Sequence, residues 1–276
     1  MPNIAADSGV WRESIKIHSY DADFRKRASV EALCRAFLEA AWNHAEQLGI
    51  GYAQLGSQNR FWVLSRLVVQ IQSYPLWGES FELTTWPRGI SSIFALRDFE
   101  LANATGTRLA AGSSSWLVLD TVTHRPQRIE KLLSRIPTAS TRMATGMDPR
   151  KLAGLERPSL ALSTIVRYSD IDVNRHVNSA SYIGWLLDSY AAEFHQGHLV
   201  RSLEVNYLDE TLWADSISVF TQQRSPVEFS HSIVKSNQPP DSKMTREPKG
   251  SEVCRAELVW SNETPESLLS TPNPGR

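Results

Sequence analysis

The sequence predicts an α+β fold made of two similar halves, and two observations lead to this prediction. First, residues 67–85 align without a gap on residues 203–221, with identical residues at six of nineteen positions. About one identity is expected by chance in such a window, so the match indicates an internal repeat. Second, each half combines one stretch of helical periodicity with several stretches that alternate like β-strands. Two such layers in tandem would pair their antiparallel sheets and cover each other's edges.

The first half contains a predicted amphipathic helix over residues 29–48, after a short strand. Apolar residues recur there at i, i+3, i+4 and i+7, Ser29 suits the N-cap position, and Gly49 suits the stop. Alternating apolar and polar residues predict the strands that follow. These strand-like segments lie within residues 67–85, at residues 95–101 and at residues 115–120.

The second half repeats this order. Helical spacing predicts a helix from Ser179 to about Phe194, with Asn178 or Ser179 as its N-cap and Gly197 beyond its end. Strands are predicted within residues 203–221, at residues 228–234 and at residues 255–260. Each half is therefore expected to lay one long helix across an antiparallel sheet.

Two stretches outside these elements have the composition of connections. Residues 135–159 lack sustained periodicity and carry three prolines, which is typical of a linker. Residues 235–252 are polar, charged and proline-rich, which is typical of a mobile loop. The predicted division is an N-terminal domain at 1–137, a linker at 138–160, a C-terminal domain at 161–262 and a disordered tail at 263–276.

Composition excludes several classes of protein. The chain has 276 residues, of which 41% are hydrophobic, as in ordinary globular proteins. A net charge of −1 gives no global field that favours nucleic acid or a membrane surface. The two cysteines, Cys34 and Cys254, make neither a disulfide framework nor a metal cluster, and fit a reducing compartment. With no apolar run of membrane-span length and no signal-peptide pattern, we expect a cytoplasmic protein.

A run of polar residues directly precedes the second predicted helix. Its members, at every second position, are Asp170, Asp172, Asn174 and His176. In an extended chain they would share one side, beside the unpaired N–H groups and positive dipole end of the helix. The run could be a calcium loop, the wet face of an edge strand, or a catalytic site whose donors surround an oxyanion. A calcium loop needs Gly at its sixth position and Glu at its twelfth, and this chain has Arg and Ser there.

The internal repeat separates the two remaining interpretations. The first copy keeps two acids of the run, but Arg27 stands about where His176 would be. Aligned on the shared Leu-Trp pair, Glu210 corresponds to Tyr74. Residues needed only for the fold should be kept in both copies, so the residues that differ are expected to carry chemistry. The sequence therefore predicts one site, in the second copy.

Several segments are similar to those of one known family. They are "DVNRHVNSASYIGWLLDS" and "LEVNYLDETLWADS" in the second half, and "FWVLSRLVVQI", "FALRDFEL" and "SSSWLVLDTVTHRP" in the first. These segments resemble the acyl-acyl carrier protein thioesterase family of bacteria and plant plastids. The resemblance implies two tandem hot-dog domains. It also implies a hydrolase that frees fatty acid from the phosphopantetheine arm of acyl carrier protein.

The resemblance also implies a catalytic set. Its residues in this chain are Asp172, Asn174, His176 and Glu210. The chain departs from the family pattern at two places. Plant members usually have Cys where this chain has Thr211, which argues against a cysteine nucleophile. They usually have Asn where this chain has Ser179, a residue that leaves helix capping intact.

A thioester is already activated, so a positioned water and an oxyanion hole can suffice for its hydrolysis. Glu210 would take the proton from the water, which requires a buried carboxylate, or would attack the thioester directly. His176 and Asn174 would hold the water and the carbonyl, and Asp172 would orient one of them. The expected oxyanion donors are the N–H groups at the helix N-terminus, near Val177 and Asn178.

The acyl chain needs an apolar channel, which the resemblance places largely in the first domain. The candidates for its lining are Trp62, Leu64, Trp86, Ile90, Ile93 and Phe94. Acyl carrier proteins are acidic, so a local basic surface is expected to dock them. The basic residues that cluster after the first domain are Arg125, Arg128, Lys131, Arg135 and Arg142. We expect no cofactor, no metal and no nucleic-acid partner, and a homodimer is compatible with the sequence.

Two other function classes stay open at this point. One is a hot-dog enzyme that acts on coenzyme A thioesters, either as a thioesterase or as a hydratase. The other is a non-catalytic acyl-binding module. A complete polar set in one copy argues against the module, because binding an acyl chain needs no such set.

Overall fold

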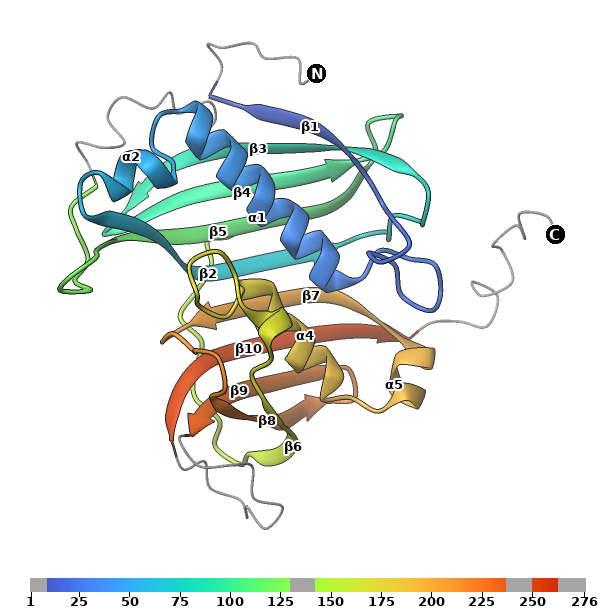
Figure 1. The fold of residues 1–276 in the computed structure, drawn as a ribbon. Helices are drawn as coiled ribbons and strands as arrows, with labels where there is room; N and C mark the ends of the chain where they lie inside the picture. Colours follow the sequence, from blue (N-terminus) through green and yellow to red (C-terminus); the bar gives the residue numbers. More distant parts are fainter. Residues whose placement is uncertain (1–8, 130–141, 237–249, 263–276) are drawn as a thin grey trace.

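One antiparallel sheet runs through the whole molecule (Figure 1). The computed structural model describes residues 9–129, 142–236 and 250–262. Within these residues the sheet has ten strands in the order β1-β3-β4-β5-β2-β7-β10-β9-β8-β6. Five neighbouring strands belong to the first half of the chain and five to the second, so the repeat seen in the sequence is a repeat of the fold.

The elements of the first half follow the predicted order. They are β1 (Trp11–Lys16), α1 (Val30–Gln47), α2 (Tyr52–Gly56), β2 (Arg60–Ile71), β3 (Ser80–Ser91), β4 (Phe94–Ala102) and β5 (Arg108–Asp120). Those of the second half are β6 (Ser159–Ile165), a 3₁₀ turn (Tyr168–Asp170), α4 (Ser179–Asp188), α5 (Ala192–Gly197), β7 (His198–Tyr207), β8 (Ser216–Ser225), β9 (Glu228–Ser236) and β10 (Ser251–Asn262). Within the described residues, the predicted strands are therefore confirmed.

The two halves join where β2 pairs with β7, and the pairing is symmetric. Leu67 lies opposite Val205, and Val69 lies opposite Leu203. Because Leu67 and Val69 correspond in the repeat to Leu203 and Val205, this register has the symmetry of a two-fold axis between the strands. The junction removes one edge from each half-sheet, as predicted for tandem layers.

The predicted first helix is confirmed as α1. Ser29 is its N-cap, with a side-chain oxygen that accepts a hydrogen bond from Ala32 N at 3.1 Å. Leu33, Phe37 and Ala41 lie on the buried face of α1, which packs on the core-facing side chains of its sheet. α1 and α4 also contact each other, so the helices of both halves lie together on one face of the sheet (Figure 1).

The predicted second helix, from Ser179 to about Phe194, is wrong in its length. It breaks after Asp188 and resumes at Ala192 as the short helix α5. At the break, the Ser189 hydroxyl donates to the Leu186 carbonyl at 2.6 Å, a side-chain bond that competes with helical hydrogen bonding. The break lets Tyr190 pack its ring on Trp260, with ring centroids 4.8 Å apart.

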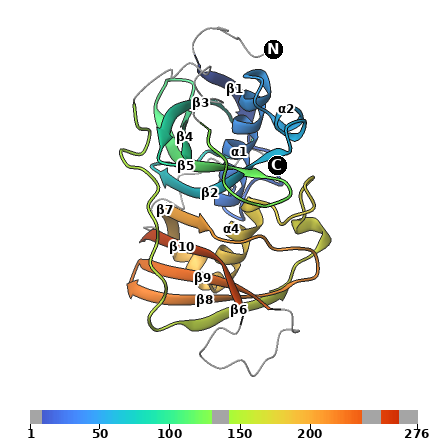
Figure 2. The ribbon, with the colours of Figure 1, turned by 90° about the vertical axis from the view of Figure 1, so that its left-hand side faces the viewer.

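Residues 142–158, which we call the strap, are the described part of the connection between the halves. The strap lies along the opposite face of the sheet (Figure 2). Ala144 N donates to the Asp98 carboxylate at 2.8 Å, and Leu152 N donates to the Asn206 side chain at 2.8 Å. Burial raises the pKa of Asp98, and its bonds to the strap and to Arg88 oppose this rise. The strap therefore covers buried polar side chains of the sheet.

The other predicted connections fall partly or wholly outside the described residues. Most of the predicted loop at 235–252 and the whole predicted tail at 263–276 lie there. The domain boundaries at 137 and 160 stay predictions. Within the described residues, no helix is long and apolar enough to cross a membrane.

Candidate active site

The polar run before α4 is a closed loop, not an extended strand. Ile171 and Val177 form an isolated β-bridge, and Asp172 N donates to the His176 carbonyl at 2.8 Å. Arg175 has a φ of 65°, in the left-handed region that tight turns use. The expectation that alternate residues share one side of a strand is therefore wrong. Hydrogen bonds within the loop decide the direction of each side chain instead.

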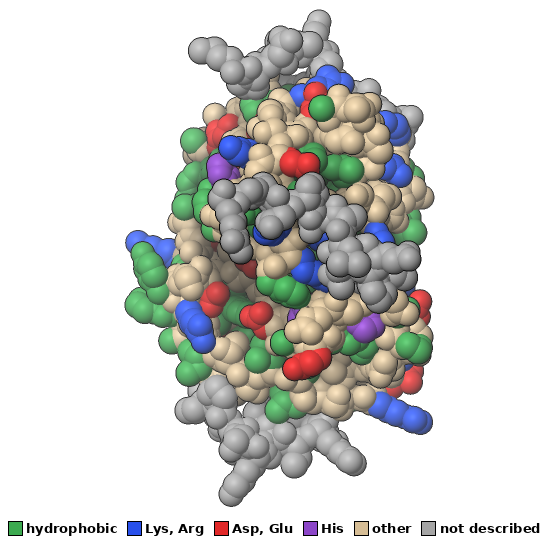
Figure 3. Space-filling view, turned by 90° about the vertical axis from the view of Figure 1, so that its right-hand side faces the viewer, with side chains coloured by type: hydrophobic (Ala, Val, Ile, Leu, Met, Phe, Trp, Pro, Cys, Tyr) green, Lys and Arg blue, Asp and Glu red, His purple; other side chains and the backbone are tan. Residues whose placement is uncertain are grey.

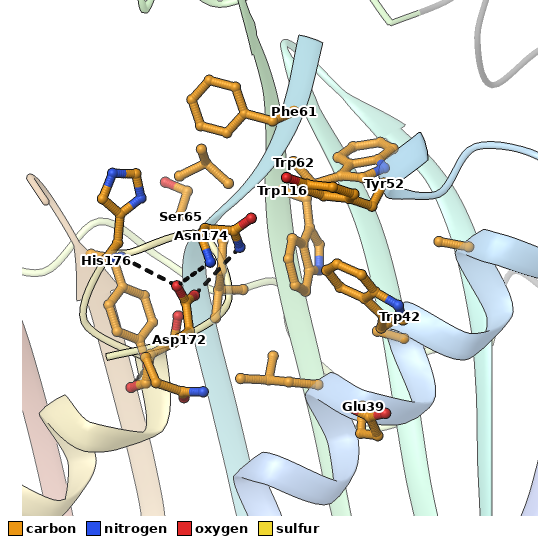
Figure 4. A pocket seen from close by; sticks show the side chains of 18 of the residues that line it. Glu39, Trp42, Tyr52, Phe61, Trp62, Ser65, Trp116, Asp172, Asn174 and His176 are labelled. Carbon is orange, nitrogen blue, oxygen red and sulfur yellow. Dashed lines mark hydrogen bonds between the residues drawn. The ribbon is translucent and has the colours of Figure 1, made fainter. Parts of the chain in front are cut away.

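Asp172 gives the loop its shape. Its carboxylate accepts the backbone N–H of Asn174 at 2.8 Å and that of His176 at 3.2 Å, and lies 3.4 Å from the Asn174 amide nitrogen (Figure 4). A carboxylate that bonds backbone N–H groups two and four residues onward stabilises a local turn. Asp172 thus fixes the backbone positions from which the side chains of Asn174 and His176 extend.

His176 meets Glu210, which comes from the connection between β7 and β8. His176 Nε2 and Glu210 Oε2 are 3.2 Å apart, and both side chains are about 40% exposed (38% and 42%). The next residue, Thr211, is fully buried and accepts a hydrogen bond from Tyr182 OH at 2.8 Å. The Thr211 carbonyl accepts Val177 N at 3.0 Å, which ties the acid segment to the histidine loop. Tertiary structure thus brings Glu210 from a distant segment to the loop that holds the other three residues of the expected catalytic set, and all four line one cavity.

Two details of the expected mechanism differ from this geometry. Glu210 is half-exposed, whereas a buried carboxylate was expected. The N–H groups of Val177 and Asn178 donate to the carbonyls of Thr211 and Asp170, at 3.0 and 2.8 Å. Each of these N–H groups already has an acceptor, so they are not free to bind an oxyanion in this structure.

A cavity of about 1630 Å³ opens beside the loop, between α1, the sheet of the first half and the His176–Glu210 pair. Figure 4 shows Asp172, Asn174 and His176 on one side of this space and Trp42, Trp62 and Trp116 on the other. Trp62 Nε1 donates to the Ile50 carbonyl at 2.8 Å, which directs one indole edge to a polar partner and leaves the rest for apolar contact. Aromatic rings thus form much of the cavity wall on the side away from the loop (Figure 4).

Two of the six residues expected to line an acyl channel, Trp62 and Leu64, line this cavity. The other four lie elsewhere. Trp86 packs with Ala111 and Ala144 under the strap, Ile90 and Ile93 are exposed, and Phe94 lies below the Arg66 guanidinium. The alternation of β3 explains Trp86. Phe81 and Leu83 face α1, and Trp86, an odd number of residues further along the strand, faces the other side.

Sequence reasoning missed part of the cavity wall. The predicted channel lining leaves out Trp42, Phe61 and Trp116, yet all three line the cavity. For Trp116 a signal exists in the repeat. It lies opposite Leu64 in β2, as Trp260 lies opposite Val200 in β7, so both halves place a tryptophan at this position.

Neither cysteine is placed to act as a nucleophile. Cys34 and Cys254 are both fully buried in the core. Burial raises the pKa of the Cys34 thiol to about 12, and it raises the pKa of Cys254 as well. Only the thiolate is strongly nucleophilic, so both thiols are inert near neutral pH. Among the described residues, no group of three or more His, Cys, Asp or Glu side chains is arranged to hold a metal ion.

The expected basic docking cluster is only partly described. Arg125 and Arg128 are exposed, and Lys131 and Arg135 lie outside the described residues. Arg142 pairs with Glu100 at 2.6 Å and lies over the Trp86 ring. On one face of the molecule, the coloured Lys and Arg side chains are interspersed with Asp and Glu (Figure 3).

Comparison with known proteins assigns the chain to a family. Residues 8–135 match the acyl-ACP thioesterase N-terminal domain, and residues 156–262 match the acyl-ACP thioesterase C-terminal domain. A chloroplastic palmitoyl-acyl carrier protein thioesterase of Arabidopsis thaliana is 27% identical over 281 residues, covering 97% of this chain and 68% of the relative. A chloroplastic oleoyl-acyl carrier protein thioesterase 2 of the same plant is 27% identical, covering 84% and 68%.

Solved structures show the same fold. An acyl-ACP thioesterase from Bacteroides thetaiotaomicron superposes with a TM-score of 0.79 at 24% identity, covering 94% of this chain and all (100%) of that one. A 12:0-ACP thioesterase from Umbellularia californica gives a TM-score of 0.76 at 24% identity, covering 92% and 98%. The predicted α+β fold with tandem hot-dog domains is confirmed. With both domain models matched in order along one chain, this protein is a thioester hydrolase that belongs to the acyl-ACP thioesterase family.

Proposed function

We propose that this protein hydrolyses the thioester between a fatty acyl group and acyl carrier protein, which releases free fatty acid and ends chain elongation. The observation that carries the proposal is the contact between His176 and Glu210, 3.2 Å apart, on the wall of a 1630 Å³ cavity. The His176–Glu210 pair is partly exposed to solvent, so a carrier protein bound at the surface could present its thioester to it. An apolar space behind it could hold the acyl chain.

Glu210 is the proposed general base. A water between the carboxylate and the thioester would attack the carbonyl carbon while its proton passes to Glu210. The tetrahedral intermediate would then break its C–S bond, and the departing thiolate of the carrier's arm would take that proton. His176, whose Nε2 lies 3.2 Å from Glu210 Oε2, would orient the carboxylate. The arm would cover the half-exposed pair when bound and exclude bulk water from it.

Asn174 is the proposed donor to the developing oxyanion. Its amide lies 3.4 Å from Asp172 Oδ2, a long contact that leaves donor capacity for a substrate carbonyl. Val177 N and Asn178 N already donate to backbone carbonyls, so a side chain is better placed for this role than they are. An oxyanion donor of this kind typically contributes about 10²–10³ to the turnover number.

The covalent alternative, in which Glu210 attacks the thioester and forms an acyl anhydride, makes a distinct prediction. Hydrolysis of such an anhydride can leave an oxygen atom from water in the Glu210 carboxylate. A single turnover in ¹⁸O-labelled water, followed by mass spectrometry of the peptide that contains Glu210, separates the routes. We expect no label in Glu210, and label there would replace the general-base mechanism by the covalent one.

The substrate class is tested by presenting one acyl group on two carriers. Hydrolysis of a palmitoyl or lauroyl thioester should be faster on acyl carrier protein than on coenzyme A, since only the protein carrier offers a docking surface. Faster hydrolysis of the coenzyme A thioester would favour the acyl-CoA thioesterase alternative, and binding without release of acid would favour the acyl-binding module. Docking through Arg125 and Arg128, a homodimer and a cytoplasmic location stay predictions.

A further inference from the structure

Glu210 lies in the connection between β7 and β8, and a lysine from β9 holds this segment. Lys235, near the end of β9, donates from Nζ to the Glu210 carbonyl at 2.6 Å. The same ammonium group pairs with the Asp209 carboxylate at 2.9 Å. Asp209 in turn accepts Glu210 N at 2.9 Å. Lys235, Asp209 and Glu210 therefore form a closed set of contacts around the backbone of the acid, which we call the lysine clamp.

The lysine clamp is of the kind that restrains backbone well. The Lys235 side chain is 23% exposed, so water and salt screen its contacts less than those of a surface pair. Both of its bonds are charge-assisted, and such bonds are shorter and stronger than neutral ones. Thr211 anchors the segment on the other side of Glu210 through its buried bond with Tyr182. The backbone of Glu210 is thus held on both sides, and its side chain pairs with His176.

The internal repeat provides a control within the same chain. In the first half, Ala102 pairs with Glu82, as Val234 pairs with Ser218 in the second, so the residue after Ala102 corresponds to Lys235. That residue is Asn103. Its side chain closes its own turn, where it accepts Thr105 N at 3.1 Å and Thr107 N at 2.9 Å.

The position of Glu210, like that of Lys235, holds a different residue in the first copy. Tyr74 stands in the first half where Glu210 stands in the second, and Tyr74 OH donates to the Val200 carbonyl at 2.7 Å. The lysine therefore occurs in the copy that has the acid and is replaced in the copy that lacks it. A residue that served only to finish a β-strand would have no reason to follow this pattern.

We propose that Lys235 is a positioning residue for the hydrolysis reaction, whose ammonium group holds the Glu210 backbone so that the carboxylate stays within reach of His176 and the attacking water. This inference rests on the proposed function of Glu210. A misplacement of about 1 Å at a reacting group can cost about 10² in rate. The effect of losing the clamp should therefore appear in kcat rather than in substrate binding.

The test compares Lys235→Met, which keeps the length of the side chain, with Lys235→Arg, which keeps the charge. Steady-state hydrolysis of one acyl-acyl carrier protein should show kcat lowered about tenfold or more in Lys235→Met, with KM within about threefold of wild type. Lys235→Arg should recover most of the loss, since a guanidinium can also bond a carbonyl and a carboxylate. Asp209→Asn, which weakens the clamp without touching Lys235, should lower kcat in the same direction.

The matched control is Asn103→Ala, at the equivalent position of the first half. It should lower the unfolding midpoint, because it removes the acceptor that closes a turn, and leave kcat unchanged. A kcat of Lys235→Met within twofold of wild type would overturn the inference. The inference would also be overturned if Lys235→Met and Lys235→Arg lost the same amount of kcat and this loss matched the fall in their unfolding midpoints. If Lys235→Met does not fold, an unchanged kcat in Asp209→Asn would overturn the inference instead. Failure of the proposed function is separate, because the wild-type protein would then release no acid.

Discussion

The two loops that precede the long helices share their hydrogen bonds but differ in their chemistry. Asp23 N donates to the Arg27 carbonyl at 2.7 Å, as Asp172 N donates to the His176 carbonyl at 2.8 Å. The Asp23 carboxylate accepts backbone N–H groups two and four residues onward, at 2.8 and 3.1 Å, as that of Asp172 does. In both loops the third residue after the aspartate has a positive φ, 61° in the first and 65° in the second.

This comparison divides the expected catalytic set into two parts. Asp172 has a counterpart that makes the same bonds, so its contacts belong to the architecture of the loop. Asn174, His176 and Glu210 have no such counterparts, because Arg25, Arg27 and Tyr74 stand in their places. The Arg25 guanidinium donates to the His198 carbonyl at 3.3 Å, and Tyr74 OH bonds the Val200 carbonyl. In the first copy, polar side chains join the two halves at the place where the second copy has its reactive pair.

The two halves also differ in how well the space between their helix and their sheet is filled. Counting from the shared loops, Ala41 and Ala45 of α1 correspond to Tyr190 and Phe194. The two alanines line the cavity, whereas the two rings pack on Trp260, at centroid distances of 4.8 and 5.1 Å. Small side chains leave room in the first half, and aromatic ones fill it in the second. One chain therefore combines a reactive loop from its second half with an open cavity in its first.

The largest expected effect comes from the residues that the first copy lacks. Glu210→Gln and His176→Ala should each lower kcat about 10²–10⁴-fold, the usual contribution of general acid–base groups, with little change in stability. Their double variant should be barely worse than either single variant, as for groups that act together. Tyr74→Phe, at the position equivalent to Glu210, should leave kcat unchanged. Full activity in either Glu210→Gln or His176→Ala would contradict the single-site interpretation.

Filling the cavity should change which acyl chains are accepted. Ala41→Phe would place a ring where the second half has Tyr190, so hydrolysis of the longest good substrate should fall about tenfold or more relative to shorter ones. Chromatography of the released acids measures this shift. An unchanged product profile in a folded variant would show that the acyl chain lies elsewhere.

The mirror variant, Tyr190→Ala, should open space in the second half. It removes a partly buried ring from the cluster with Trp260 and Phe229, at a cost of about 3 kcal/mol in the free energy of unfolding. Because the cavity beside the reactive loop lies under α1 in the first half, the product profile should stay unchanged. Denaturant unfolding and the same chromatography give both results, and a new product profile would mean that this space can take substrate.

Asp23→Ala and Asp172→Ala test whether the two loops are equivalent as architecture. Each variant leaves two backbone N–H groups without their acceptor. The free energy of unfolding should therefore fall by about 1–3 kcal/mol in each, and by a similar amount in both. Only Asp172→Ala should lower kcat, since its loop carries Asn174 and His176. Equal kcat in the two variants would show that the loop tolerates the loss of its carboxylate without displacing the reactive groups.

The smallest expected effect lies at a turn shared by both halves. Gly78 and Ala214 occupy equivalent positions, with φ of 88° and 68°. A side chain costs about 1–2 kcal/mol in this left-handed region, so Ala214→Gly should raise the free energy of unfolding and Gly78→Ala should lower it by about the same amount. Thermal or denaturant unfolding measures both. A loss of stability in Ala214→Gly would mean that contacts of the Ala214 methyl group outweigh the backbone strain.

The internal repeat made much of this protein predictable from its sequence. Helical spacing and Ser29 predicted α1 almost to the residue, and alternation predicted the strands, because these patterns are local and are repeated in two copies. The replacement of His176 by Arg27 and of Glu210 by Tyr74 pointed to the candidate site, since residues that a fold needs are kept in both copies and these are not.

Period-two spacing was a misleading guide to the loop, because the same spacing suits a strand and a turn. The Asp172 carboxylate decides between them through its bonds to the N–H groups of Asn174 and His176. The sequence also could not show that a helix from Ser179 would break at Ser189. The ring of Tyr190 finds its partners on β9 and β10, which lie far along the chain.

The sequence by itself determined the repeat, the order of the elements, and which polar residues belong to one copy alone, because those follow from side-chain patterns along the chain. Only the tertiary structure decided that His176 and Glu210 meet, that Lys235 holds the acid segment, and that the cavity lies under Ala41 and Ala45. These facts depend on distances between strands and on which face of the sheet a side chain takes. A contact between distant segments forms when packing brings them together, and no local pattern records it.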